Sequence, residues 1–335
     1  MPGDARRPGR LRLTESVFVT YPIPGPGIDI LRASFETRVR ETEMAPSADE
    51  IAEGAGGCAG IVTLIRDAMD APLLDRLPGL RAIANFGVGF DNIDVAAATA
   101  RKVMVTNTPD VLTEATADIA FALLLASARR LGEGERMVRA GLFHGWTPKM
   151  LIGADIAGAT LGLVGFGRIA AAVARRAGGF DMRLLHTARG EHPEAASLGS
   201  RRVDLDHLLS ESDFVSIHVP LSDTTRHLID GKALRKMKPT AHLINTARGP
   251  IVDEAALVDA LNKGIIAGAG LDVYEREPQL HPGLLARENV VLLPHLGSAS
   301  AGARAGMSRL AAENMVEALS GGRPPNLLNP EVLDG

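Results

Sequence analysis

The sequence is poor in the features that mark disulfide-rich, membrane-spanning and nucleic-acid-binding proteins. Its 335 residues include one cysteine, Cys58, which excludes an internal disulfide and favours a reducing, cytoplasmic location. No apolar run reaches the roughly 20 residues that cross a bilayer. The net charge of −4 gives no attraction for nucleic acid or for an anionic membrane. The basic N-terminal stretch 1–13 has no apolar segment of the secretory type, so we expect a frayed leader there.

Short apolar runs alternate with helical stretches along the whole chain, and its length favours two domains. Because these runs are continuous rather than alternating, they predict strands that are buried on both faces of a parallel sheet. We expect a first series at 17–20, 38–41, 60–65, 80–85 and 103–106. A second, six-strand series is expected at 160–164, 183–186, 214–219, 242–245, 267–273 and 290–293.

Two long helices are expected outside these series. Residues 113–131 are apolar nearly all round, with Thr113 as N-cap and Gly132 just beyond the end, which indicates a helix buried on several sides. Residues 299–319 form a closing helix that is expected to return to the first domain.

The second series opens with a glycine-rich turn. Gly165, Gly167 and Ala170 match G-x-G-x-x-G/A, with Arg168 and Ile169 between them, and the turn joins an expected strand to an expected helix. Gly165 permits the tight turn, and Gly167 lets the backbone approach a pyrophosphate. The helix N-terminus would present free N–H groups to that diphosphate. The pattern predicts a dinucleotide site, with an ordinary βα turn as the alternative.

The tip of the following strand lacks the acid of an NAD site. Where Asp or Glu would bind the ribose, the sequence has Thr187 and Arg189. Thr187 removes a charge that would repel a phosphate, and Arg189 offers a forked donor for two phosphate oxygens. The tip therefore predicts NADP(H) as the preferred cofactor. NAD(H) stays possible because Glu191 is close in sequence, and a solvated surface arginine is the alternative for Arg189.

Three polar residues follow later strands at their carboxyl ends, where open α/β sheets bind ligands. Arg248 can hold a carboxylate through two hydrogen bonds. His295 can exchange a proton near neutral pH, and a carboxylate at Glu277 beside it would favour the imidazolium. Surface, loop or structural positions are the alternatives for these residues, and Glu275 competes with Glu277. The histidines show no metal-binding spacing, so no metal site is predicted.

Several ordered motifs identify a family. The chain resembles the D-isomer-specific 2-hydroxyacid dehydrogenases, and within them it is most similar to glyoxylate/hydroxypyruvate reductases. The resemblance covers nearly the whole chain and rests on the glycine turn, Asn85–Asp94, Asn107–Pro109, His218–Leu221, Asn245–Gly249, Gly270–Pro278 and Pro294–Ser298.

The resemblance implies two Rossmann-like or flavodoxin-like parallel-sheet domains with a cofactor and substrate cleft between them. It implies a discontinuous substrate domain, 1–108 with 299–335, and a dinucleotide-binding domain, 109–298. It also implies a homodimer, in which Trp146 is expected either to reach the neighbouring subunit's substrate pocket or simply to pack.

The resemblance also assigns roles to individual residues. Arg248 is expected to bind substrate, His295 to be the acid–base, and Glu277 to orient and tune it. Backbone groups of Phe86, Gly87, Val88 and Gly89 are expected to receive the substrate carboxylate. Cofactor contacts are expected at Val88, Thr116, Gly165, Gly167, Arg168, Ile169, Thr187, Arg189, His218, Val219, Pro220, Thr225, Thr246, Ala247, Arg248, Asp272, His295 and Gly297.

Together these observations predict NADPH-preferring reduction of a small 2-oxo acid to the D-2-hydroxy acid, with glyoxylate and hydroxypyruvate as leading substrates. One alternative is another dehydrogenase of the family, of the D-3-phosphoglycerate, formate or 2-ketogluconate type. A second alternative, from a different functional class, is a dinucleotide-sensing corepressor with the same fold.

Overall fold

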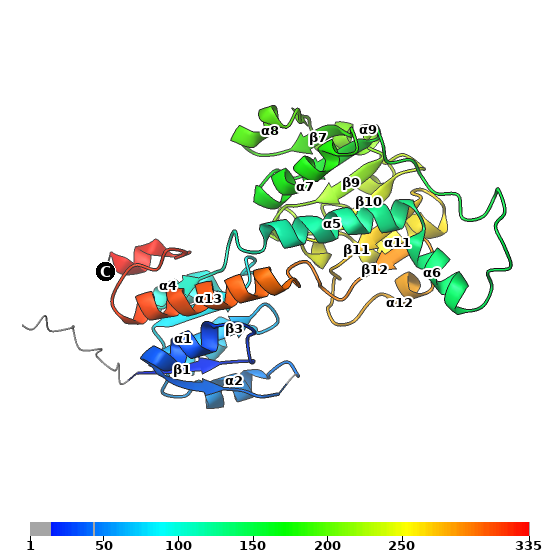
Figure 1. Cartoon of the computed structure of the whole chain (residues 1–335). Helices are drawn as coiled ribbons and strands as arrows, with labels where there is room; N and C mark the ends of the chain where they lie inside the picture. Colours follow the sequence, from blue (N-terminus) through cyan, green and yellow to red (C-terminus); the bar gives the residue numbers. More distant parts are fainter. Residues whose placement is uncertain (1–14, 43, 335) are drawn as a thin grey trace, which may run out of the picture. The chain divides into compact units, whose positions relative to one another are not determined.

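The computed structural model describes residues 15–42 and 44–334, so the predicted N-terminal leader lies outside the described residues. The chain divides into two compact units. One contains the residues up to Leu112 together with those from Ser300 onward, and the other is Thr113–Ala299. Each unit has a parallel sheet with helices packed on it (Figure 1), which confirms the predicted α/β class. No helix in the described part of the chain is long and apolar enough to cross a membrane.

The first unit has a five-stranded parallel sheet in the order β2-β1-β3-β4-β5. Its strands β1 and β4 are buried along their whole length, and β3 is buried except at Leu64, because helices cover both faces. The edge strand β2 alternates between exposed and half-buried residues. The strands are β1 Ser16–Val19, β2 Glu36–Val39, β3 Gly60–Leu64, β4 Ala82–Phe86 and β5 Met104–Thr106. The helices are α1 Gly27–Ser34, α2 Ala48–Gly54, α3 Ala71–Asp75, α4 Val95–Ala100 and α13 Ala301–Leu319.

The last part of the chain completes this first unit. Helix α13 begins after the N-cap Ser300, whose hydroxyl accepts the Ala303 N–H. It packs along α1 (Figure 1) and also contacts β4. Beyond it, Leu327 forms an antiparallel bridge with Thr106. The Asn329 side chain, before the short helix η2 (Pro330–Leu333), accepts the Val105 N–H at 2.8 Å. The free edge of β5 is thereby covered by the end of the chain.

The second unit has a seven-stranded parallel sheet in the order β12-β11-β10-β9-β6-β7-β8. Chain order reverses between β6 and β9, and such a switch point opens a crevice at the carboxyl ends of the strands. The strands are β6 Thr160–Val164, β7 Arg183–Thr187, β8 Arg201–Arg202, β9 Phe214–Ile217, β10 His242–Asn245, β11 Gly268–Leu271 and β12 Val290–Leu292. The helices are α5 Thr113–Ala128, α6 Leu131–Arg139, α7 Arg168–Gly178, α8 Pro193–Ser197, α9 Leu205–Glu211, α10 Gly231–Leu234, η1 Gly249–Ile251, α11 Glu254–Asn262 and α12 Pro282–Leu285.

Two predictions about this unit were wrong. The predicted helix 113–131 ends at Ala128, Arg130 takes a left-handed conformation with φ of 54°, and Gly132 lies inside α6 rather than beyond a helix end. The Arg130 guanidinium binds both carboxylate oxygens of Glu133, at 2.9 and 2.6 Å, which stabilises this break. Thr113 is the first residue of α5 rather than its N-cap.

The second error is the predicted six-strand series, because the sheet has a seventh strand, β8. This strand is two exposed arginines at the edge of the sheet, so no apolar run marks it. In the first unit, β2 lies two residues earlier than predicted, since this edge strand has no continuous apolar run either.

Candidate active site

The glycine turn joins β6 to α7 with space left open at the helix N-terminus. Gly165 has a φ of 90°, and a Cβ there would lie 2.7 Å from Val219 Cγ1, so both conformation and packing require glycine. Gly167 is the N-cap of α7 without a side-chain cap, and a Cβ there would meet no atom within 4 Å. Arg168 and Ile169 open the helix, and the buried Ala170 packs against the sheet. The turn therefore has the open approach that a pyrophosphate needs.

The tip of β7 is tied to this turn. The Thr187 hydroxyl accepts the Gly165 N–H at 3.2 Å, which fixes the strand end beside the glycine turn. Arg189 is exposed, and its carbonyl accepts a hydrogen bond from Arg202 Nη2 at 3.2 Å. Neither guanidinium has an acidic partner among residues 15–42 and 44–334, and the exposed Glu191 forms no ion pair within the same ranges. The Arg202 guanidinium therefore lies against the backbone of Arg189, just beyond the strand tip.

Sequence reasoning missed Arg202, because the search for apolar runs did not find β8. The basic pair Arg201-Arg202, which follows the β7 tip in the sequence, is the signal that would have pointed to Arg202.

The turn after β9 forms the next part of this edge. The His218 N–H donates to the Val164 carbonyl at 2.8 Å, and His218 Nε2 lies 2.8 Å from the Ser216 hydroxyl. Burial lowers the pKa of His218 to about 4, so this imidazole is neutral. Val219 and Pro220 follow, and Thr225 closes the turn by donating to the Pro220 carbonyl at 2.7 Å. The Thr225 hydroxyl is therefore engaged within the protein.

Arg248 is held where the loop after β10 meets the loop after β11. Its carbonyl accepts from Asn245 Nδ2 at 3.0 Å, and its Nη1 donates to the Ala247 carbonyl at 2.8 Å. A Cβ on Gly249 would lie 1.8 Å from the Tyr274 carbonyl carbon, so only glycine allows the two loops to meet. The guanidinium stays half-buried at the carboxyl edge of the sheet.

His295 and Glu277 form a hydrogen-bonded pair. His295 Nδ1 lies 2.8 Å from Glu277 Oε2, and their side chains are 26% and 35% exposed. The other oxygen, Oε1, accepts the Tyr274 N–H at 3.0 Å. Burial alone would raise the pKa of Glu277, but the hydrogen bond to His295, aided by Arg248 nearby, lowers it overall. The competing carboxylate of Glu275 binds His227 instead, at 2.9 Å.

Asp272 fixes the loop that carries His295 through hydrogen bonds to its backbone. Its carboxylate, fully buried, accepts the Leu296 N–H at 2.6 Å and the Gly297 N–H at 2.7 Å. Burial raises the pKa of Asp272, against the opposing effect of these two amides. A Cβ on Gly297 would lie 3.4 Å from Thr116 Cγ2, so Thr116, Asp272 and Gly297 are neighbours. The structure thus brings these three predicted residues together.

In the first unit, the loop Phe86–Gly89 is held by its carbonyl groups. Asn85 Nδ2 donates to the Gly89 carbonyl at 2.7 Å, and Asn107 Nδ2 donates to the Val88 carbonyl at 2.8 Å. A Cβ on Gly87 would lie 2.6 Å from Ile65 Cγ2, so this glycine is required by packing. The N–H groups of Val88 and Gly89 are half-buried and have no acceptor in the described part of the chain. They are two donors available to an anion.

The second unit offers features that fit a dinucleotide. Besides the open approach at Gly167, the buried Thr246 hydroxyl has no hydrogen-bond partner. A bound polar group would satisfy it. No group of three or more His, Cys, Asp or Glu suited to a metal ion occurs among the described residues.

Comparison with known proteins gives the family. The model of the D-isomer specific 2-hydroxyacid dehydrogenase NAD binding domain matches residues 121–297. A glyoxylate reductase of Thermococcus onnurineus is 49% identical, over 95% of this chain and 97% of that protein. One of Korarchaeum cryptofilum is 51% identical, over 95% and 96%.

Solved structures agree. A glyoxylate reductase from Paecilomyes thermophila has a TM-score of 0.86 at 32% identity, covering 95% of this chain and 99% of that one. An NADPH-dependent glyoxylate/hydroxypyruvate reductase from Sinorhizobium meliloti, in complex with NADP and malonate, has a TM-score of 0.85 at 37% identity, covering 94% and 97%. The chain therefore belongs to the D-isomer-specific 2-hydroxyacid dehydrogenase family and is an NAD(P)-dependent oxidoreductase.

Proposed function

We propose that this protein reduces a small 2-oxo acid, of the glyoxylate and hydroxypyruvate type, to the D-2-hydroxy acid, and that it prefers NADPH. The observation that carries the proposal is the hydrogen bond between His295 and Glu277 beside Arg248, at the carboxyl edge of a dinucleotide-type sheet. The names of the similar glyoxylate reductases and the NADP complex of one of them support it.

The side chains of the second unit fit the reduction of a carbonyl group. The Arg248 guanidinium can bind the substrate carboxylate through two hydrogen bonds. With Nδ1 of His295 donating to Glu277, the other ring nitrogen, Nε2, can carry the proton that the carbonyl oxygen receives. General acid catalysis of this kind contributes about 10²–10⁴-fold. When bound, the nicotinamide cofactor supplies the hydride.

Glu277 acts through His295 rather than on the substrate. Its ionised carboxylate fixes the ring orientation and stabilises the imidazolium from which the proton leaves. The Tyr274 N–H holds Glu277 in turn, so the pair is oriented by the backbone of the loop after β11. This arrangement suits a proton donor, His295, whose imidazole ring is held in one orientation.

The preference for NADPH rests on the β7 tip. Thr187 brings no negative charge there. Arg202 donates to the Arg189 carbonyl, and neither guanidinium has an acidic partner in the described chain. A 2′-phosphate carries about two negative charges and would accept from both. With NADH, the same two cations would have no anion to bind.

We assign the two domains accordingly. Residues 109–298 form the dinucleotide-binding domain, and 1–108 with 299–335 form the substrate domain. In the substrate domain, the Val88 and Gly89 N–H groups receive the substrate carboxylate. We assign the remaining cofactor contacts to the glycine turn, the turn from His218 to Pro220, Thr225, Thr246, Ala247 and the Thr116, Asp272 and Gly297 cluster.

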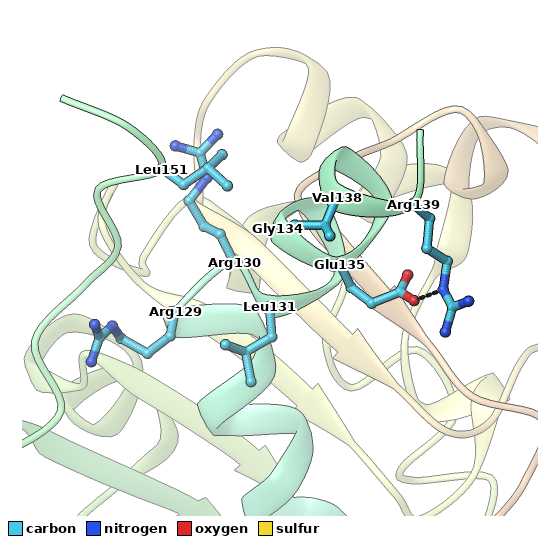
Figure 2. Close-up of a pocket in the computed structure, with 8 residues that line it drawn as sticks. All are labelled: Arg129, Arg130, Leu131, Gly134, Glu135, Val138, Arg139 and Leu151. Atoms are coloured by element: carbon cyan, nitrogen blue, oxygen red, sulfur yellow. Dashed lines mark hydrogen bonds and ion pairs between the residues drawn. The ribbon is translucent and has the colours of Figure 1, made fainter. Parts of the chain in front are cut away.

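We also propose a homodimer formed through the segment 131–152. Large apolar side chains are exposed along it, among them Val138 (61%), Leu142 (61%) and Trp146 (79%). Leu131, Val138 and Leu151 line a groove of about 650 Å³. Figure 2 shows these side chains, with the Glu135–Arg139 ion pair nearby. Such a patch is unusual on a monomer. In the dimer, Trp146 would be available to reach the partner's substrate pocket.

The test is a steady-state assay of cofactor oxidation with glyoxylate, hydroxypyruvate, pyruvate, phenylpyruvate and 2-ketogluconate, each with NADPH and with NADH. We expect the highest kcat/KM with glyoxylate or hydroxypyruvate and NADPH. A clear preference for 2-ketogluconate would assign a different substrate within the family. Negligible turnover with every 2-oxo acid, together with tight dinucleotide binding, would instead indicate a sensor.

A further inference from the structure

Arg304 is a half-buried cation for which the described residues of its unit provide no acceptor. It lies in the first turn of α13, where its N–H donates to the Ser300 carbonyl at 2.9 Å. Its guanidinium carbon lies 5.8 Å from the centroid of the Phe86 ring. Among the described residues, the guanidinium has no hydrogen-bond or ion-pair partner.

The position of the Arg304 guanidinium within the first unit is unfavourable for a positive charge. Partial burial removes hydrating water, and it lowers the pKa of Arg304 below its ordinary value. The N-terminal turn of the 19-residue helix adds partial positive charge from its peptide dipoles. Contact with one aromatic ring offsets only part of such a cost. The arrangement therefore indicates that an anion completes this site.

The loop beside Arg304 supplies neutral donors for the same anion. Phe86, whose ring contacts the guanidinium, leads directly into the Val88 and Gly89 N–H groups. Every residue from Asn85 to Phe90 is uncharged, so the loop has hydrogen-bond donors and no charge of its own. Arg304 provides the missing charge within the same unit, so its place beside the loop does not depend on the other unit.

We propose that Arg304 is a second substrate-binding cation, which holds the carboxylate of the 2-oxo acid together with the loop N–H groups. The inference rests on the proposed function. A carboxylate has about four lone-pair sites, so it can accept from the loop N–H groups and from Arg304 at the same time. If Arg304 only packed against Phe86, it would be a structural residue. A structural role and a substrate-binding role predict different kinetics.

The variant Arg304→Met distinguishes the two roles, because methionine keeps an apolar side chain beside Phe86 and removes the charge. We expect KM for glyoxylate and for hydroxypyruvate to rise by about 10- to 100-fold. KM for NADPH and the thermal midpoint should stay close to those of the unmodified protein. Arg304→Lys should recover part of the loss. Arg309→Met, at an exposed position of the same helix, is the matched control and should leave all constants unchanged.

A binding measurement makes the test independent of turnover. Oxalate, a dianion of similar size to glyoxylate, is titrated calorimetrically into the NADPH-saturated full-length protein. We expect oxalate to bind about 10-fold or more weakly to Arg304→Met than to Arg309→Met. If the unmodified protein turns over no 2-oxo acid, the proposed function fails, and this titration still decides whether Arg304 binds a carboxylate. Equal oxalate affinity and equal substrate KM in the two variants would overturn the inference. So would a fall in thermal midpoint with parallel losses for substrate and cofactor.

Discussion

At the scale of single residues, two carboxylates two positions apart have different partners. Glu277 binds His295, whereas Glu275 binds His227. We expect Glu277→Gln to lower kcat by about 10- to 100-fold, because an amide no longer stabilises the imidazolium. Glu275→Gln is the matched control and should change kcat little. The measurement is steady-state kinetics of both variants with saturating NADPH, and equal losses would contradict the assignment of Glu277.

The proposed preference for NADPH also depends on single residues. Arg189→Ala should raise KM for NADPH by about 10-fold or more and leave KM for NADH nearly unchanged, because only NADPH carries the 2′-phosphate. Arg202→Ala should act in the same direction. Arg201→Ala, next to it on β8, is the control. Comparing KM for both cofactors in each variant is the measurement, and a better KM for NADH than for NADPH in the unmodified protein would refute this interpretation.

At the scale of elements, the two glycines of the β6–α7 turn should respond differently to a methyl group. Gly167→Ala has room for its Cβ and an ordinary φ, so it should fold normally and bind cofactor weakly, since the methyl group occupies the pyrophosphate approach. Gly165→Ala should lower the thermal midpoint by several degrees, because of its positive φ and the contact with Val219. Thermal unfolding with and without NADPH measures both effects. A cofactor-induced stabilisation of Gly167→Ala equal to that of the unmodified protein would contradict the prediction.

The sequence predicts some elements better than others, and the difference depends on what stabilises each element. Strands β6 and β10 have their predicted bounds, because buried parallel strands have apolar side chains at consecutive positions. The exposed β8 has no such run. The break after α5 contains an ion pair between Arg130 and Glu133, which no apolar pattern marks. Arg304 gave no signal in the sequence, because its burial and its lack of a partner are properties of the packed structure.

At the scale of the whole molecule, the exposed apolar side chains of 131–152 predict association of two copies. We expect the protein to elute with twice the mass of one chain in size-exclusion chromatography with light scattering. The double variant Val138→Lys/Leu142→Lys should shift it toward the monomer, because it places charges on the proposed interface. Leu333→Lys, an exposed leucine outside this segment, is the control. An unmodified protein that is monomeric at micromolar concentration would refute the dimer.

The closure of the first unit by the end of the chain also sets an order of events during synthesis. Val105 leaves the ribosome long before Asn329, which lies 224 positions later and supplies its hydrogen-bond acceptor. By then the whole second unit, which ends at Ala299, has been translated. In the nascent chain, the first unit is therefore still incomplete when the second unit is already able to fold. The face of β4 that packs against α13 in the folded unit stays uncovered for that interval.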